Sequence, residues 1–259
     1  MGCCVTKSLV IDSSDDNEST QLVHIPPSTR DNNIYSLSCL NGCNLTYVTT
    51  RSKKKISVLE IKPFYTAVTK KIVIFSHSSS SDIYTFFDDL RKFSSEYGII
   101  TVCYDYPGYG LSKGKPTEKQ CYEALEAVID FYNRRMYEII LIGISFGTGV
   151  VIDYSHKKDW HNPIILISPH KNISKNTIFG ERIIFSTSSK IGDLFCPIKI
   201  FHGQSDNVVN VSQAKDLYKK LSNKAFSPVW IKDVGHYDVL NKINKRDINE
   251  VLEFVKNYD

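Results

Sequence analysis

The sequence lacks the features that identify several large classes of protein. No run of apolar residues approaches the ~18 that a helix needs to cross a bilayer. No basic, then apolar leader with a small-residue cleavage site opens the chain, so we expect no secretion. The net charge of +4 is spread along all 259 residues and gives no reason to expect a nucleic-acid partner. One large globular domain is the organisation that remains, since 42% of the residues are hydrophobic.

The seven cysteines form neither a disulfide framework nor a zinc pattern. Their number is odd, and only Cys39 and Cys43 have the spacing of one half of a metal site. No second Cys/His pair follows at the spacing of a zinc site, so we expect no metal. Free thiols are typical of a reducing compartment, which favours an intracellular location.

Phosphate-binding glycine loops are also missing. The sequence holds no G-x-x-x-x-G-K-[ST] pattern, and Gly108-Tyr109-Gly110 lacks the third glycine of a dinucleotide site. We therefore expect no nucleotide and no other cofactor.

The first residues match a lipidation pattern. Met1-Gly2-Cys3-Cys4-Val5-Thr6 fits M-G-x-x-x-[ST], with Gly2 as the myristoyl acceptor once Met1 is removed. Cys3 and Cys4 follow at once, where palmitoylation adds a second chain. A single myristoyl chain holds a protein at a membrane only weakly, so a second lipid is needed for stable residence. We expect a lipid anchor on Gly2, Cys3 and Cys4; the alternative is an unmodified terminus that matches by chance.

This anchor defines the expected organisation of the chain. Residues 12–20 are nearly all Ser, Asp, Asn, Glu and Thr, which is typical of a solvated tether. We expect a disordered, lipid-anchored tail over residues 1–30 and one domain over residues 31–259. The protein would then be peripheral on the cytoplasmic face of a membrane. The sequence leaves the oligomeric state open, with a monomer favoured.

Short apolar runs alternate with amphipathic stretches through the rest of the chain. The apolar runs predict strands at 44–50, 56–61, 71–76, 99–104, 139–144, 164–168, 198–202 and 229–234. The amphipathic stretches predict helices at 82–97, 146–157, 212–221 and 247–255. A further helix is predicted to begin at Thr117, where Gln120 completes a capping box. Several strands are continuous Ile, Val and Leu runs, as in parallel strands covered by helices on both faces. The pattern predicts an α/β fold with a mostly parallel central sheet.

The segment Gly143-Ile144-Ser145-Phe146-Gly147 lies between a predicted buried strand and a predicted helix. This is G-x-S-x-G in the context that a nucleophile elbow requires, where a sharp turn lifts the serine hydroxyl above the sheet. Ser145 is therefore the candidate nucleophile; the alternative is a plain glycine-rich turn.

A serine nucleophile needs a base and an acid, which follow it in the order acid, then His in such a sheet. Asp206 follows the strand at 198–202, and His236 follows the strand at 229–234. Ligands bind at this carboxyl edge of a parallel sheet. Asp206 and His236 are thus the expected acid and base, with Asp105, Asp193 and Asp233 as weaker alternatives for the acid.

The remaining histidines have no such support. His77 and His202 end strands and are expected to fix local loop geometry, and the others are expected on the surface or in loops: His24, His156, His161 and His170. Two backbone N–H groups should form the oxyanion hole, one of them from Phe146, the residue after the nucleophile. We assign the other to Ser79, with Ser78 as the alternative, in the loop after the strand at 71–76.

These motifs together resemble the α/β-hydrolase domain-containing protein 17 group of membrane-anchored depalmitoylases. The resemblance is carried by Phe75-Ser76-His77, Tyr104 to Gly110 with Gly114 to Lys119, the Ser145 elbow, His202-Gly203 with Asp206, and Gly235-His236. It extends from about Asn44 to the end of the chain. It implies an α/β-hydrolase fold in which Ser145, Asp206 and His236 are nucleophile, acid and base, and in which S-acylated proteins are the substrates.

Two features differ from that group. Its His-Gly-Asn after the third strand is replaced here by His77-Ser78-Ser79. Its N-terminal cysteine cluster is reduced to Cys3 and Cys4.

The connection between the strands at 164–168 and 198–202 is only about thirty residues long and polar, which predicts a short cap and an open site.

The expected function is hydrolysis of fatty-acyl thioesters on S-palmitoylated proteins through an acyl-enzyme on Ser145. Two alternatives stay open. One is a lipid or small-ester hydrolase, of the monoacylglycerol lipase or carboxylesterase type, because the triad does not distinguish esters from thioesters. The other is a non-catalytic membrane adaptor, suggested by the serines in the oxyanion loop, since Gly reaches conformations that Ser avoids.

Overall fold

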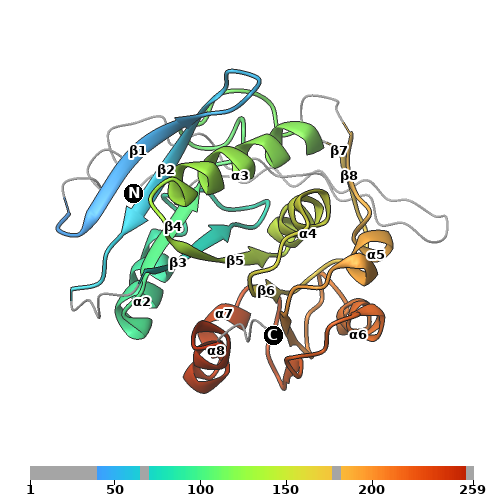
Figure 1. Ribbon diagram of the computed structural model, residues 1–259. Helices are drawn as coiled ribbons and strands as arrows, with labels where there is room; N and C mark the ends of the chain where they lie inside the picture. The colour runs from blue at the N-terminus through green and yellow to red at the C-terminus, as the bar shows by residue number, and fades with distance from the viewer. Residues whose placement is uncertain (1–39, 65–69, 177–181, 255–259) are drawn as a thin grey trace, which may run out of the picture.

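An eight-stranded sheet crosses the molecule in the order β1-β2-β4-β3-β5-β6-β9-β10 (Figure 1). The computed structural model describes residues 40–64, 70–176 and 182–254. The strands are β1 (Cys43–Thr49), β2 (Lys55–Ile61), β3 (Lys71–Ser76), β4 (Ile100–Tyr104), β5 (Glu138–Ile144), β6 (Ile164–Ile167), β9 (Ile198–Gly203) and β10 (Val229–Ile231). β1 and β2 form an antiparallel hairpin, β2 is antiparallel to β4, and the pairings from β4 to β10 are parallel. The predicted mostly parallel sheet is confirmed.

Helices cover both faces of this sheet. The alternation along β3 sends Ile72 and Ile74 into one core and Val73 and Phe75 into the other. The first core is closed by α3 (Glu118–Asn133), α4 (Phe146–Lys158) and α6 (Val211–Lys220). The second is closed by α2 (Phe87–Tyr97), α7 (Val239–Lys242) and α8 (Lys245–Leu252). In Figure 1, α3 and α4 lie above the sheet and α2 and α8 below it. This is the three-layer arrangement of an α/β-hydrolase.

The start of α2 and the cap of α3 differ in part from the predictions. α2 begins at Phe87 rather than Asp82, because the Asp82 carboxylate accepts hydrogen bonds from the N–H and the hydroxyl of Thr85 and holds a turn there. At the start of α3, Thr117 accepts from Gln120 N–H as predicted. The reciprocal half of the capping box is not made, since the Gln120 side chain accepts from Lys115 N–H instead.

The connection from β6 to β9 holds a second, two-stranded sheet that the sequence analysis did not predict. It consists of β7 (Ile173–Asn176) and β8 (Arg182–Phe185), followed by α5 (Thr187–Lys190) and the 3₁₀ turn η1 (Ile191–Asp193). Ile173 and Phe185 are buried against Gly149 of α4. The hairpin therefore packs on the first turns of α4 as a short cap.

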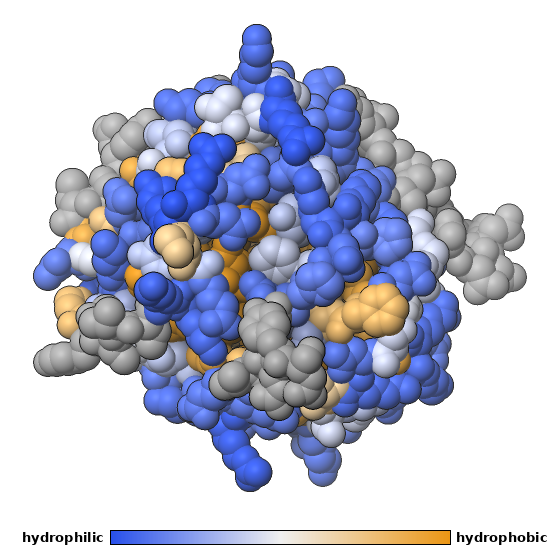
Figure 2. Space-filling model, viewed as in Figure 1, coloured by the Kyte–Doolittle hydropathy of each residue, from blue (hydrophilic) through white to orange (hydrophobic). Residues whose placement is uncertain are grey.

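The predicted tail, with Gly2, Cys3 and Cys4, lies outside the described residues, which begin at Leu40. Within the described ranges, no helix has the length and apolar character needed to cross a bilayer. Figure 2 shows a face covered largely by hydrophilic side chains, with smaller hydrophobic areas between them.

Candidate active site

Ser145 occupies a strained turn between β5 and α4. Its backbone has φ 51° and ψ −112°, a region that costs a non-glycine residue about 1–3 kcal/mol. Both flanking glycines are required by this turn. A Cβ on Gly147 would lie 1.9 Å from the Ser76 carbonyl oxygen, and one on Gly143 would lie 2.7 Å from the Gly147 carbonyl oxygen. The motif thus places the Ser145 hydroxyl where β5 ends.

The structure brings Ser145, Asp206 and His236 together. His236 Nε2 lies 3.0 Å from Ser145 Oγ, and His236 Nδ1 lies 2.7 Å from Asp206 Oδ2. The three side chains come from the turns after β5, β9 and β10, whose carboxyl ends share one edge of the sheet. All three are buried. This is the geometry of a nucleophile, a base and an orienting acid.

The surroundings of Asp206 keep its carboxylate charged. Its Oδ1 accepts hydrogen bonds from the N–H groups of Val208 and Val209, and His202 Nε2 lies 3.2 Å from its Oδ2. Burial raises the pKa of this carboxyl, but the hydrogen bonds from His202, His236 and Val209 N–H outweigh burial and hold the pKa well below its usual range.

The ionised Asp206 fixes the tautomer of His236. A carboxylate only accepts hydrogen bonds, so the proton of the neutral imidazole resides on Nδ1. Nε2 then presents a lone pair to the Ser145 hydroxyl. His236 is therefore arranged to remove the serine proton.

Phe146 supplies the backbone N–H that follows the nucleophile, and this N–H donates to no group among the described residues. Its ring is fully buried and packs edge-on between Tyr106, 5.3 Å away, and Phe185, 5.5 Å away. The first turn of α4 is therefore fixed by contacts with the loop after β4 and with the short cap.

The expected oxyanion loop after β3 is held by two tyrosines that the sequence analysis did not assign. Tyr106 donates its hydroxyl to the His77 carbonyl at 2.7 Å, and Tyr109 donates to the Ser79 carbonyl at 3.2 Å. His77 Nδ1 bonds the Ser78 carbonyl at 2.7 Å, in line with the expected role in loop geometry. The assignment of Ser79, or Ser78, as the second oxyanion donor stays a prediction.

His170 is a further member of the site. The sequence predicts a surface or loop residue at this position; the structure places it in a loop, where it is only 8% exposed and its Nε2 lies 3.3 Å from Ser145 Oγ. It sits in the loop between β6 and β7. No motif marks this position, so only its place directly after a predicted strand could have indicated it.

The alternative acids lie elsewhere. Asp105 is buried among Ser57, Ile83 and Leu111, which donate to its carboxylate. Asp193 is exposed and pairs with His156, and Asp233 is exposed beside Lys232. In the described part of the chain, no group of three or more His, Cys, Asp or Glu could hold a metal ion.

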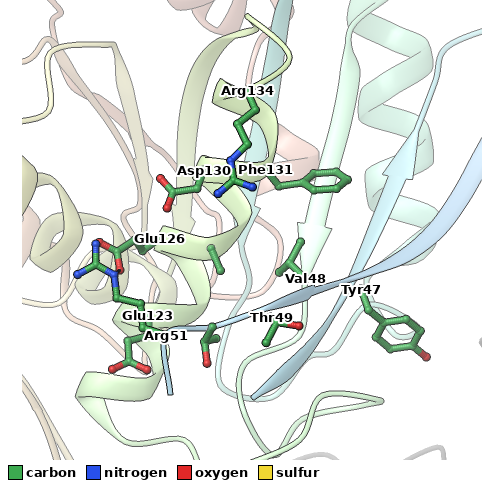
Figure 3. A pocket seen from close by; sticks show the side chains of 11 residues that line it. Tyr47, Val48, Thr49, Arg51, Glu123, Glu126, Asp130, Phe131 and Arg134 are labelled. Carbon is green, nitrogen blue, oxygen red and sulfur yellow. Dashed lines mark ion pairs between the residues drawn. The ribbon is translucent and has the colours of Figure 1, made fainter. Parts of the chain in front are cut away.

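A separate hollow of about 530 Å³ lies between the end of β1 and α3 (Figure 3). Arg51 lies there beside Glu123 and Glu126, and its Nε is 3.0 Å from Glu126 Oε2. None of the three residues of the triad lines this hollow.

The chain is 39% identical over 225 residues to an alpha/beta hydrolase of Acanthamoeba polyphaga mimivirus, and the match covers 82% of this chain and 85% of that relative. The chain belongs to the alpha/beta hydrolase family. The sequence model described as "Alpha/beta hydrolase family" matches residues 73–189, which include the elbow and the start of α5. This membership makes the protein a hydrolase and agrees with the Ser145–His236–Asp206 arrangement.

More distant relatives show how far the likeness extends. The human alpha/beta hydrolase domain-containing protein 17B is 29% identical over 182 residues, covering 66% of this chain but 62% of that protein. This alpha/beta hydrolase thus spans less than two thirds of the length of that relative. An esterase structure from Pyrococcus furiosus superposes with a TM-score of 0.68 at 18% identity, over 91% of this chain and 98% of that one. That likeness concerns the fold.

Proposed function

We propose that this chain is a serine hydrolase that cleaves fatty-acyl thioesters from S-acylated proteins at a membrane. The observation that carries the proposal is the hydrogen-bonded chain of the triad. Asp206 Oδ2 lies 2.7 Å from His236 Nδ1, and His236 Nε2 lies 3.0 Å from Ser145 Oγ. The substrate class is supported by the resemblance to the group 17 depalmitoylases and by the N-terminal lipidation pattern.

The reaction would run in two halves on Ser145. His236 Nε2 takes the hydroxyl proton as Oγ attacks the thioester carbonyl. The tetrahedral oxyanion is held by the N–H of Phe146 and of Ser79, worth about 3 kcal/mol for each donor. The carbon–sulfur bond then breaks, and His236 returns the proton to the departing cysteine thiolate, leaving an acyl ester on Ser145.

Water completes the cycle. His236 removes a proton from a water molecule that attacks the acyl ester, and the second tetrahedral intermediate collapses with return of that proton to Ser145 Oγ. The fatty acid leaves and the free enzyme is restored. Asp206 stays ionised throughout and stabilises the imidazolium of His236.

Labelling with a serine-reactive fluorophosphonate tests the catalytic part of the proposal. We expect the wild type to be labelled and the Ser145→Ala variant to be unlabelled. An unlabelled but folded wild type would leave the non-catalytic adaptor as the better interpretation. Turnover of an acyl-cysteine peptide against a monoglyceride then separates a thioesterase from a lipid-ester hydrolase, since only the first should prefer the peptide.

Membrane anchoring through Gly2, Cys3 and Cys4 belongs to the same proposal. A Gly2→Ala variant cannot be myristoylated, so we expect it to move from the membrane to the soluble fraction of cells. Unchanged partitioning would refute myristoylation as the anchor.

A further inference from the structure

The turn between β1 and β2 carries the sequence Arg51-Ser52-Lys53-Lys54-Lys55. β2 runs antiparallel to β4, with Val58 opposite Tyr104 at the end of β4. The start of β2 therefore extends past the carboxyl end of β4. This is the same edge of the sheet from which Ser145 projects, because β4, β3 and β5 are parallel.

The loop after β4 adds two more lysines to this turn. Lys113 N–H donates to the Lys55 carbonyl at 2.8 Å, and Ser57 N–H donates to Ser112 Oγ at 2.9 Å. Lys115 follows in the same loop and is exposed. We call Lys53, Lys54, Lys55, Lys113 and Lys115 the basic edge.

The basic edge is tied to the active site through the same loop. Tyr106 and Tyr109 lie in this loop and donate to the carbonyls of His77 and Ser79 in the expected oxyanion loop. The segment that carries Lys113 is thus bonded to the turn of lysines on one side and to the catalytic edge on the other. These contacts place the backbone of the basic edge relative to the active site.

Charge is left unbalanced at three of the lysines of the basic edge, Lys53, Lys54 and Lys113. The acids of α3 are used by other cations: Glu126 pairs with Arg51, and Glu123 with Lys119. Among the described residues, no carboxylate forms an ion pair with Lys53, Lys54 or Lys113. The Nζ of Lys55 lies over the ring of Tyr47, 3.8 Å from its centroid.

We propose that the basic edge docks on an anionic lipid surface and turns the active site toward it. The proposal rests on the proposed function, which requires Ser145 to reach an acyl-cysteine at a membrane. Each lysine near an anionic surface raises affinity about fivefold. A basic patch beside a single acyl chain also gives the second signal that stable anchoring needs.

The test measures binding of the full-length, unacylated chain to phosphatidylcholine vesicles with and without phosphatidylserine. We expect binding only to the vesicles that contain phosphatidylserine, with affinity lost at high ionic strength. In the triple variant Lys53→Glu, Lys54→Glu, Lys113→Glu, affinity should fall by at least about 100-fold.

The matched control makes the same charge change at the opposite edge of the sheet. Lys62, Lys70 and Lys224 are exposed there, after β2 and before β3 and β10. Their triple change to Glu should reduce affinity much less. Equal losses in the two triple variants, or equal binding to both kinds of vesicle, would overturn the proposal.

Activity separates this inference from the proposed function. Hydrolysis of a water-soluble nitrophenyl ester should be unchanged in the Lys53, Lys54 and Lys113 variant, whereas hydrolysis of an acyl-cysteine peptide held on phosphatidylserine vesicles should fall. If the wild type hydrolyses neither substrate, the proposed function fails, and vesicle binding still decides on the basic edge. If the variant hydrolyses the vesicle-bound peptide as fast as the wild type, the docking role is refuted.

Discussion

His170 Nε2 lies 3.3 Å from Ser145 Oγ, close to the 3.0 Å that separates the same oxygen from His236 Nε2. A serine hydroxyl has one proton to donate and two lone pairs that accept. If Ser145 donates to His236, whose Nε2 carries a lone pair, its contact with His170 requires that His170 carry a proton on Nε2. The nucleophile is then held between an acceptor and a donor.

This contact predicts the effect of changing His170. Removal of the donor in His170→Leu should lower kcat/KM for a nitrophenyl ester by about 3- to 10-fold, the value of one neutral hydrogen bond. His170→Gln keeps an N–H donor and should recover most of that loss. Both variants should still react with a fluorophosphonate. Identical kinetics for the Leu and Gln variants would show that the bond does not contribute.

Gly147 tests the close approach of the elbow to β3. A Cβ at this position would lie 1.9 Å from the Ser76 carbonyl oxygen, and neither backbone can yield without moving the turn. Gly147→Ala should therefore lower the free energy of unfolding by about 3 kcal/mol or more, measured by urea denaturation. In the control Gly235→Ala, the new Cβ has no heavy atom nearer than 3.9 Å, so its stability should match that of the wild type. A stable Gly147→Ala protein would contradict the packing described for the elbow.

The triad could be predicted from the sequence because its evidence is local. The two glycines around Ser145 are needed because the elbow turn leaves no room for a Cβ at these positions. Asp206 and His236 each follow a strand that can be recognised from its apolar residues. The order of elements then places all three at one edge of the sheet. Such reasoning needs no knowledge of which distant side chains meet.

Two of the features that the sequence did not reveal depend on contacts between distant segments, and a third depends on a local side-chain turn. His170 reaches Ser145 because β6 is the parallel neighbour of β5, so the loop after β6 lies beside the elbow, and the order of strands in the sheet is not written in any local residue pattern. The β7–β8 hairpin has strands of only four residues each, and it is stabilised by packing of Phe185 on Gly149 of α4. The late start of α2 follows from a side-chain turn at Asp82, where a local hydrogen bond overrides the helical periodicity.

Asp105 should make stability fall as pH rises. Burial, with the nearby carboxylate of Asp82, raises the pKa of Asp105 to about 7 against the hydrogen bonds from Ile83, Ser57 and Leu111. Between its unfolded pKa, about 3.9, and 7, the folded state then holds a proton that the unfolded chain has lost. The contribution is complete below the unfolded pKa and is lost toward pH 7, with a slope of up to about 1.4 kcal/mol per pH unit.

The contribution of His77 to stability changes with pH in the opposite direction to that of Asp105. The dependence of wild-type stability on pH therefore does not reveal either group by itself. Burial lowers the pKa of His77 to about 4, and its contribution to stability is therefore lost as pH falls from 6.5 toward 4. The measurement is urea denaturation at several pH values for wild type, Asp105→Asn and His77→Gln. Relative to wild type, Asp105→Asn should gain stability as pH rises to 7, and His77→Gln should gain as pH falls. Parallel profiles for all three proteins would rule out both assignments.

Asp206→Asn should keep the base, His236, but change the hydrogen bond that orients its imidazole. The amide can present N–H to His236 Nδ1, which favours the tautomer with its proton on Nε2, so the imidazole no longer accepts the Ser145 proton. A comparable change in a serine protease lowers kcat by about 10⁴-fold, and we expect a loss of that order for a nitrophenyl ester. Asp193, exposed and paired with His156, offers the matched change Asp193→Asn, which should leave kcat unaltered.

The same variant tests the depressed pKa of Asp206. A carboxyl whose folded pKa is lowered contributes stability above its unfolded pKa, about 3.9, and loses it as pH falls further. Asp206→Asn should therefore be less stable than wild type at pH 7, and the two free energies of unfolding should converge as the solution is acidified below that value. If the difference between them stayed constant with pH, Asp206 would not be held ionised by His202 and His236, and the tautomer of His236 would have to be set in another way.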